Sequence, residues 1–250
     1  MIYWIWMKNI SGIGPHAQRK LLKTFENPKE VYCVKFEDLI AAGLSEKQAK
    51  AVLENKSLNE AEKVLRDCER FGISIVNISE QNFPTRMRSI NDMPVVLYYK
   101  GIMFEPDKTS GIVGPRKCSQ QTKNKTIDIT ARCIKEGNTI VSGMALGVDG
   151  YAHTSALKNK GKTIAIVGHG LDMCFPKAHQ TLFEAIKKNG CVISEYDPGV
   201  PALSYHFPRR NAIIAALSDT LYVVDAGRNS GSLITASFAE KYGKRCIRDF

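Results

Sequence analysis

From residue 109 onwards, short apolar runs alternate strictly with longer stretches in which apolar residues recur at helical spacing. Val, Ile and Leu crowd the short runs without alternating with polar residues, as in strands that are covered on both faces. The predicted strands are residues 109–113, 138–142, 163–168, 190–195, 220–225 and 244–247. The predicted helices cover about 119–136, 149–159, 177–188, 208–217 and 232–243. This order predicts an α/β fold: an extended Rossmann-like, doubly wound, mostly parallel sheet that binds ligands at the carboxyl edge of its strands.

Residues 1–70 show helical spacing and predict a small helical module. One predicted helix covers residues 17–25, and Ser45 is the predicted N-cap of a later helix. Helix, Gly-x-Gly turn, helix is the layout of sterile-alpha-motif-like and helix–hairpin–helix modules, in which the amides of Gly12 and Gly14 could meet a phosphate. A tight turn between two helices is the favoured interpretation of these glycines, because acidic residues balance the basic ones nearby.

Two β-like runs, residues 73–78 and 94–99, lie between the helical module and the alternating region. Two strands alone would be marginally stable, so we expect both to join the C-terminal sheet. The predicted domains are therefore a helical module over residues 1–70 and an extended Rossmann-like domain over residues 71–250.

Four glycine-bearing turns follow successive predicted strands, and arginine or lysine lies in or beside most of them. They begin at Gly114, Ser142, Gly168 and Asn229. Each turn joins a strand to a helix and so offers backbone N–H groups at a helix N-terminus, where the helix dipole favours anions. Four such turns along one sheet edge predict a ligand longer than a nucleotide, such as a nucleic-acid backbone.

The positive charge is concentrated in the half of the chain that carries these turns. Residues 1–105 hold 15 Lys and Arg against 13 Asp and Glu, whereas residues 106–250 hold 20 against 12. The net charges are thus +2 and +8, which together make the total of +10. A basic second half points to a polyanionic partner there.

The cysteines and the N-terminus predict a cytoplasmic protein. Seven cysteines are odd in number and form no C-x-x-C motif, which is typical of reduced thiols. The apolar residues 1–7 have no basic residue before them and no cleavage site after them, so they predict a buried first helix and not a signal peptide. No apolar run approaches the ~18 residues of a membrane span.

The residues offer little for catalysis or for a cofactor. The turns lack a G-x-G-x-x-G dinucleotide motif and a Walker Gly-Lys-Ser/Thr motif. Asp149 and His153 have a spacing that can hold a metal, but helix capping by Asp149 and packing of His153 are the favoured interpretation. His169, Cys174 and His179 do not have the spacing of a zinc finger. We expect no catalytic residue, no metal and no organic cofactor.

The stretch 207–214 is the richest in binding groups. Pro208 at a predicted helix start places two arginines and an amide in the first turn, where they face an anion. Arg228 adds a cation at the fourth turn, and Phe175 and Tyr205 either stack on bases or pack at the rim. The predicted DNA-binding residues are Gly114, Arg116, Lys117, Ser142, Gly143, Gly168, Gly170, Phe175, Lys177, Arg209, Arg210, Asn211, Ser230, Gly231 and Ser232.

Taken together, these motifs resemble the DNA-processing protein A family, also called Smf. The matching segments are residues 113–116, 142–149, 163–172, 175–178, 194–196, 207–211 and 230–236. Their order and spacing, with the helical region before them, cover nearly the whole chain.

The resemblance implies a single-stranded-DNA-binding protein of natural transformation. Such a protein protects incoming strands and helps to load a RecA-type recombinase, acting as a homodimer away from membranes. The family's basic positions fall on Arg116, Lys177 and Arg210. The family usually has arginine where this chain has Ala212, and Arg209 could substitute for it. The family also continues past the last strand, so the C-terminal end looks truncated here, which leaves dimer formation open.

Two other function classes remain open. The first is a small-nucleotide sensor or nucleotide hydrolase, although related sheets carry a Pro-Gly-Gly-x-Gly-Thr loop where this chain has residues 229–232. The second is an interaction scaffold in which the helical module recruits a partner. Steep salt dependence of oligonucleotide binding would favour the DNA-binding function over the mononucleotide one.

Overall fold

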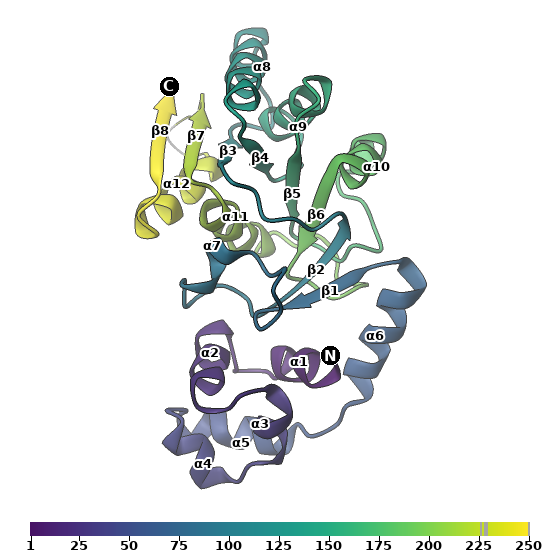
Figure 1. Ribbon diagram of the computed structural model, residues 1–250, viewed down its shortest axis with the longest axis vertical. Coiled ribbons are helices and arrows are strands. Elements are labelled where there is room, and N and C mark those ends of the chain that lie inside the picture. Colours follow the sequence, from purple (N-terminus) through teal and green to yellow (C-terminus); the bar gives the residue numbers. More distant parts are fainter. Residues whose placement is uncertain (226, 228–229, 250) are drawn as a thin grey trace. The chain divides into compact units, whose positions relative to one another are not determined.

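The computed structural model describes residues 1–225, 227 and 230–249, with the side chain of residue 249 excepted. Asn229, the first residue of the fourth predicted turn, and Arg228, the cation beside it, lie outside the described residues. The chain forms two compact units, the first of Met1–Phe83 with Asn91–Leu97 and the second of Pro84–Ile90 with the residues from Tyr98 on (Figure 1). The domain boundary near residue 70 stays a prediction.

Short helices build most of the first unit. They are α1 (Ile2–Asn9), α2 (Pro15–Thr24), α3 (Pro28–Cys33), α4 (Phe36–Ala41), α5 (Glu46–Glu54) and α6 (Asn59–Phe71). α1 buries Trp4 and Trp6, which confirms the predicted buried first helix. Ser45 caps α5 as predicted, since its hydroxyl accepts a hydrogen bond from the amide of Gln48. In the turn between α1 and α2, Gly12 has a φ of +81°, a conformation that glycine adopts most readily.

The two early strands join the sheet, as predicted. β1 (Ser74–Asn77) follows α6, and β2 (Val96–Gly101) begins in the first unit and ends in the second. Both belong to one eight-stranded sheet with the order β1-β2-β6-β5-β4-β3-β7-β8.

Strands and helices alternate through the second unit. The strands are β3 (Thr109–Val113), β4 (Thr139–Ser142), β5 (Thr163–Val167), β6 (Gly190–Ser194), β7 (Thr220–Val224) and β8 (Arg245–Asp249). The helices are α7 (Thr85–Arg88), α8 (Gln120–Lys135), α9 (Val148–Lys158), the 3₁₀ turn η1 (Lys177–His179), α10 (Gln180–Asn189), α11 (His206–Leu217) and α12 (Gly231–Lys241). The predicted fold class, a mostly parallel α/β sheet preceded by helices, is confirmed.

The strand order creates a switch point at the carboxyl edge. β3 to β8 pair in parallel, and β2 is antiparallel to β6. The chain runs from β3 outward through β4, β5 and β6, and then returns to place β7 on the other side of β3. In a doubly wound sheet the turns that follow the two strands at such a point diverge and leave room for a ligand. In this sheet the two strands are β3 and β7, and the segments that follow them are the turn after β3 and the N-terminus of α12.

Helices cover the sheet of the second unit in two groups. α8, α9 and α10 pack side by side, and α11 packs against α12 (Figure 1). The core between the sheet and the first group includes Ile112 and Ile140 from the strands and Ile129 and Val148 from the helices. α11 is buried along most of its length, with residues 212–217 at most 4% exposed. Such burial fixes the position of the loop and helix start that precede this segment.

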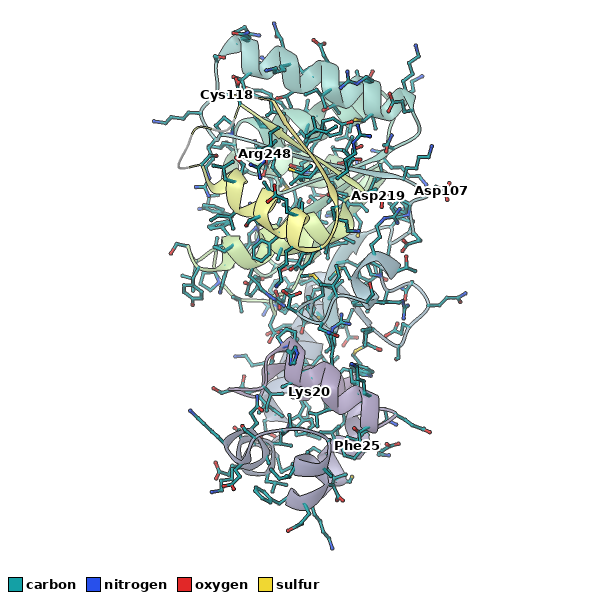
Figure 2. All side chains as sticks on the ribbon, turned by 90° about the vertical axis from the view of Figure 1, so that its left-hand side faces the viewer. Lys20, Phe25, Asp107, Cys118, Asp219 and Arg248 are labelled. Carbon is teal, nitrogen blue, oxygen red and sulfur yellow. The ribbon has the colours of Figure 1, made fainter. Side chains whose placement is uncertain are left out.

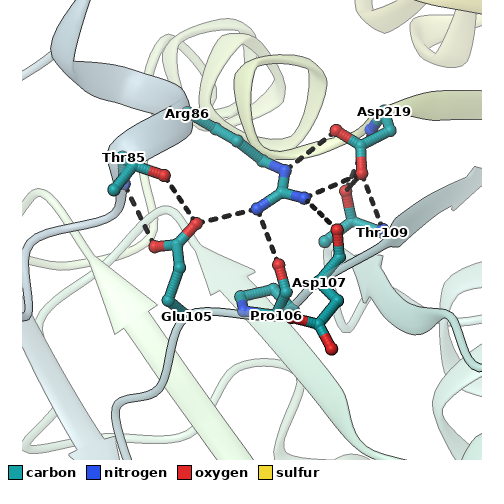
Figure 3. Close-up of polar contacts among 7 residues, drawn as sticks. All are labelled: Thr85, Arg86, Glu105, Pro106, Asp107, Thr109 and Asp219. Carbon is teal, nitrogen blue, oxygen red and sulfur yellow. Dashed lines mark hydrogen bonds and ion pairs between the residues drawn. The ribbon is translucent and has the colours of Figure 1, made fainter.

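Arg86, in α7, is the centre of a network of polar contacts at the amino ends of β3 and β7 (Figure 3). The Arg86 guanidinium donates to both carboxylate oxygens of Asp219 at 2.9 Å and to Glu105 Oε1 at 2.7 Å. Its remaining hydrogen bonds reach the carbonyl groups of Pro106 and Asp107. Burial disfavours the charged form of Asp219, but the hydrogen bonds from Arg86 and from the start of β3 outweigh burial and lower its pKa.

Figure 2 shows the separation of the two edges: Asp107 and Asp219 lie on one side of the unit, and Cys118, in the turn after β3, lies on the other.

Candidate nucleic-acid interface

Two adjoining hollows occupy the carboxyl edge of the sheet. The first, of about 420 Å³ including space open to solvent, lies between the turns after β4 and β5 and the start of α11. It is lined by Arg116, Gly143, Ala145, Leu146, Val167, Gly168, His169, Phe175, Pro176, Phe207 and Arg210. The second, of about 1070 Å³ again including space open to solvent, lies between the turn after β3 and the starts of α11 and α12. It is lined by Val113, Gly114, Pro115, Arg116, Ala145, Asp149, Ser204, Phe207, Pro208, Arg210, Asn211, Ser230, Gly231, Ser232, Ile234 and Thr235.

Phe207, with an arginine on each side, lines both hollows. The guanidinium carbon of Arg116 lies 5.2 Å from the centre of the Phe207 ring, and that of Arg210 lies 5.6 Å away. These distances are those of cation–π contacts, which hold the ring and the two cations together. Phe175, 45% exposed, brings a second ring to 6.3 Å from Phe207. The edge therefore joins exposed aromatic surface to fixed positive charge.

Arg210 is a buried cation that lies beyond the first turn of its helix, which corrects the prediction that it lies in that first turn; that it meets an anion of the DNA stays a prediction. It is 5% exposed, and its Nη1 lies 3.5 Å from Asp149 Oδ2. Asp149 also accepts a hydrogen bond from the amide of Ala145. Burial raises the pKa of Asp149, and attraction to the Arg210 guanidinium opposes that rise. Gly143 leaves room for this pair, since a Cβ there would lie 1.3 Å from Arg210 Nη1.

The start of α11 explains the correction. The helix begins at His206, so Pro208 is its third residue and the two arginines that follow lie in the second turn. Proline lacks an N–H group, but the N–H groups of a first helical turn have no partner within the helix, and proline is tolerated throughout that turn. Proline therefore did not mark the first residue of the helix.

Arg209 is held by an acid of the same edge. Its Nε donates to both carboxylate oxygens of Glu195, at 2.9 and 3.1 Å, and its side chain is 27% exposed. Ala212 is buried in α11. The substitution of Arg209 for an arginine at position 212 stays a prediction, and it would require Arg209 to leave Glu195.

The other predicted residues divide into exposed and supporting positions. Lys117 and Lys177 are exposed and line neither hollow. Ser142 is fully buried and donates from its hydroxyl to the carbonyl of Ile112 at 2.6 Å, so its side chain supports the turn. That Ser142 takes part in DNA binding stays a prediction. Gly170 is likewise buried, and its amide donates to the carbonyl of Val200.

A hydrogen bond links the two helices that border the second hollow. Asn211 donates from its side-chain amide to the carbonyl of Gly231, which links α11 to α12. Ser230 caps α12, since its hydroxyl accepts from the amide of Ser232. Gly114 and Ser232 line this hollow, and Gly168 lines the first. The exposed Tyr205 precedes α11 and lines neither hollow.

Asp149 and His153 contact different partners, and His153 packs inside the fold, as the favoured interpretation expects. The His153 ring is fully buried, with Nδ1 2.7 Å from Thr163 Oγ1. Because that hydroxyl donates to the carbonyl of Ile140, it accepts from His153 Nδ1. Burial lowers the pKa of His153 to about 3, so the ring is neutral near pH 7. Asp149 does not cap α9, whose N-cap is Gly147.

Within the described part of the chain, no group of three or more His, Cys, Asp or Glu side chains could hold a metal ion. The described helices also include none with the length and apolar character of a membrane span.

Sequence reasoning missed several residues of this edge. Phe207 was noted only as part of a basic stretch, although an aromatic residue before Pro-x-Arg was a usable signal. Asp149 pairs with Arg210, a residue 61 positions away, and no local sequence pattern predicts this pair. Leu146 and Thr235 line the hollows because of how the turns and helices pack.

Comparison with known proteins finds relatives of this chain. The sequence model of the family described as DNA recombination-mediator protein A matches residues 74–248. The protein Smf of Synechocystis sp. is 31% identical over 248 residues, which are 97% of this chain and 62% of that protein. The DNA processing protein DprA of Streptococcus pneumoniae is 41% identical over 170 residues, which are 67% of this chain and 60% of that protein. The chain thus spans about 60% of the length of these curated relatives.

Solved structures agree with the sequence comparison. The X-ray structure of DNA processing protein A from Streptococcus pneumoniae matches with a TM-score of 0.84 at 32% identity, covering 99% of this chain and 86% of that one. DNA processing protein A from Helicobacter pylori, described for its single-stranded DNA binding mode, matches with a TM-score of 0.64 at 31% identity. That match covers 70% of this chain and 80% of the other.

Proposed function

Because the chain belongs to the DNA recombination-mediator protein A family, we propose that it binds single-stranded DNA across the carboxyl edge of its sheet. The observation that carries the proposal is the pair of adjoining hollows around Phe207, with Arg116 and Arg210 beside the ring. Aromatic faces stack on bases of any sequence, and cations neutralise phosphates. Such contacts require unpaired bases and carry little sequence preference.

The charges at this edge favour a polyanion. Two acids of this edge are already paired, Asp149 with Arg210 and Glu195 with Arg209. Arg116, Lys117 and Lys177 remain exposed at the same edge. A strand that crosses the edge would therefore meet an excess of positive charge, in line with the net charge of the second half.

The similarity to the DNA processing protein of Helicobacter pylori, whose structure addresses single-stranded DNA binding, supports the same ligand here. From the sequence resemblance we extend the proposal to DNA processing in natural transformation, including protection of incoming strands and loading of a RecA-type recombinase. A homodimer, a cytoplasmic location and binding without catalysis are parts of the same proposal.

Replacing Arg116 and Lys177 by alanine tests where the strand lies. If each side chain neutralises about one phosphate, each substitution should weaken oligonucleotide binding about tenfold, or ~1.4 kcal/mol. The slope of log affinity against log salt should shrink by ~0.7 for each lost contact. Fluorescence anisotropy with an oligothymidylate over a salt series measures both quantities.

Lys188→Ala is the matched control, because Lys188 is an exposed lysine in the last turn of α10, at the opposite edge of the sheet. Its affinity and salt slope should equal those of the unchanged protein. Unchanged affinity and slope in the double variant Arg116→Ala, Lys177→Ala would place the DNA elsewhere.

A further inference from the structure

His179 joins two segments of the second unit that are far apart in sequence. Its ring Nδ1 lies 2.9 Å from the carbonyl oxygen of Met144, 35 positions earlier in the chain. Because a carbonyl oxygen only accepts hydrogen bonds, Nδ1 carries the proton and donates it to this bond. The bond connects η1, in the segment after β5, to the turn after β4.

The acceptor end of this bond belongs to a firmly held turn. Met144 has a φ of +57°, which is uncommon for a residue with a side chain, and that side chain is fully buried. Just after the same turn, the amide of Val148 donates to the carbonyl of Pro115 in the turn after β3, at 3.2 Å. The turn after β4 is therefore a fixed support for a side chain that bonds to it.

The donor end carries two residues of the proposed DNA interface. Phe175 is 45% exposed, and Lys177 is exposed in η1, two residues before His179. η1 is a single 3₁₀ turn, closed by hydrogen bonds from the amides of His179 and Gln180 to the carbonyls of Pro176 and Lys177. So short a turn has little stability of its own, and contacts with neighbouring segments decide where its side chains lie.

Gly150, in α9, leaves the space in which the His179 ring lies. A Cβ at Gly150 would be 2.7 Å from Cε1 of this ring, well inside van der Waals contact. The ring is therefore held both by its hydrogen bond to Met144 and by the surface of α9.

We propose that His179 is a positioning residue for the DNA interface, whose hydrogen bond to Met144 holds η1 so that Phe175 and Lys177 meet the strand. The inference rests on the proposed function and adds a residue that acts through its neighbours and not by touching the DNA. A strand then binds a segment that is already in place, and the free-energy cost of ordering that segment is not taken from the affinity.

Three substitutions of His179 separate the hydrogen bond from the ring. The amide nitrogen of asparagine is bonded to Cγ, as Nδ1 is in histidine, so His179→Asn keeps a donor near the same place. The nitrogen of glutamine lies one bond further out, and alanine has no donor. We expect His179→Ala and His179→Gln to bind an oligothymidylate about fivefold more weakly, the effect of one hydrogen bond, and His179→Asn to bind like the unchanged protein. Fluorescence anisotropy measures the affinities, and thermal unfolding shows that each variant is folded.

Gly150→Ala tests the same bond from the neighbouring helix. The added methyl group displaces the end of the His179 ring, whereas alanine itself is favourable in a helix. Affinity should again fall about fivefold, because the displaced ring loses its bond to Met144. In the His179→Ala background, Gly150→Ala should cause no further loss, since the ring that it would displace is already absent.

Hydrogen exchange of the free protein tests the positioning of η1 without DNA. Relative to the intrinsic rate of each sequence, the amides of residues 179 and 180 should exchange about fivefold faster in His179→Ala than in the unchanged protein. His179→Asn should restore the slower exchange. NMR spectroscopy resolves the two amides.

Unchanged affinity in folded His179→Ala would overturn the inference, and so would equal losses of affinity in His179→Asn and His179→Ala. If Lys177→Ala weakens binding while His179→Ala does not, the positioning role is wrong and the proposed function stands. If the unchanged protein binds no single-stranded DNA, the proposed function itself is wrong.

Discussion

Replacing Arg210 by alanine is expected to lower the free energy of unfolding by about 3–5 kcal/mol. The substitution leaves Asp149, itself 5% exposed, as a buried carboxylate without its cation. A buried charge that loses its partner costs far more than the pair contributed, because its hydration is not restored. Urea denaturation followed by circular dichroism measures the change.

The pH dependence of the unfolding free energy lost in Arg210→Ala shows whether the unpaired Asp149 carboxylate causes the loss. Without Arg210, the pKa of Asp149 rises further above that of the unfolded chain, because burial is then less opposed. A raised pKa stabilises the fold at low pH and loses that contribution as the pH rises through it, so the deficit should shrink in acid. Arg245→Ala, at an exposed arginine, should change stability by less than ~0.5 kcal/mol. If Arg210→Ala lost as little unfolding free energy as this control, the claim that Arg210 and Asp149 form a buried pair would be contradicted.

Arg86→Ala should produce the second large effect, a loss of about 2–3 kcal/mol of unfolding free energy. Arg86 makes ion pairs with Glu105 and Asp219 and further hydrogen bonds to two carbonyl groups (Figure 3). The two acids are more than a third exposed, so solvent screening keeps the estimate below that for the Arg210 pair. Urea denaturation again gives the value.

DNA affinity separates this effect from damage to the binding edge. The Arg86 network lies at the amino edge, so oligonucleotide binding by folded Arg86→Ala protein should match that of the unchanged protein (Figure 2). Lys108→Ala, at an exposed neighbouring position, should leave both stability and affinity unchanged. A variant that keeps its stability would show that the Arg86 contacts contribute little.

Much of the second unit was predictable because its signals are local. Runs of Val, Ile and Leu located the buried strands, and parallel pairing carried the glycine turns to one edge. In the first unit, Ser45 caps α5 as predicted, because a short hydroxyl side chain before a helical pattern is a common N-cap. The joining of the two early strands to the sheet followed from the instability of an isolated pair.

The burial of side chains at the edge was not predictable in the same way. Arg210 and Arg209 are adjacent in sequence, yet one is buried against Asp149 and the other pairs with Glu195. Both partners are distant in sequence, and only tertiary packing decides which arginine stays near solvent.

The most direct test of the account compares the affinity for a single-stranded oligonucleotide with that for a duplex of the same length and composition. Contacts to base faces and phosphates at this edge predict binding to the single strand at least about tenfold tighter, with a salt slope of about −0.7 for each phosphate contact. Equal affinity for the duplex would contradict a strand that lies across the carboxyl edge with its bases against Phe175 and Phe207.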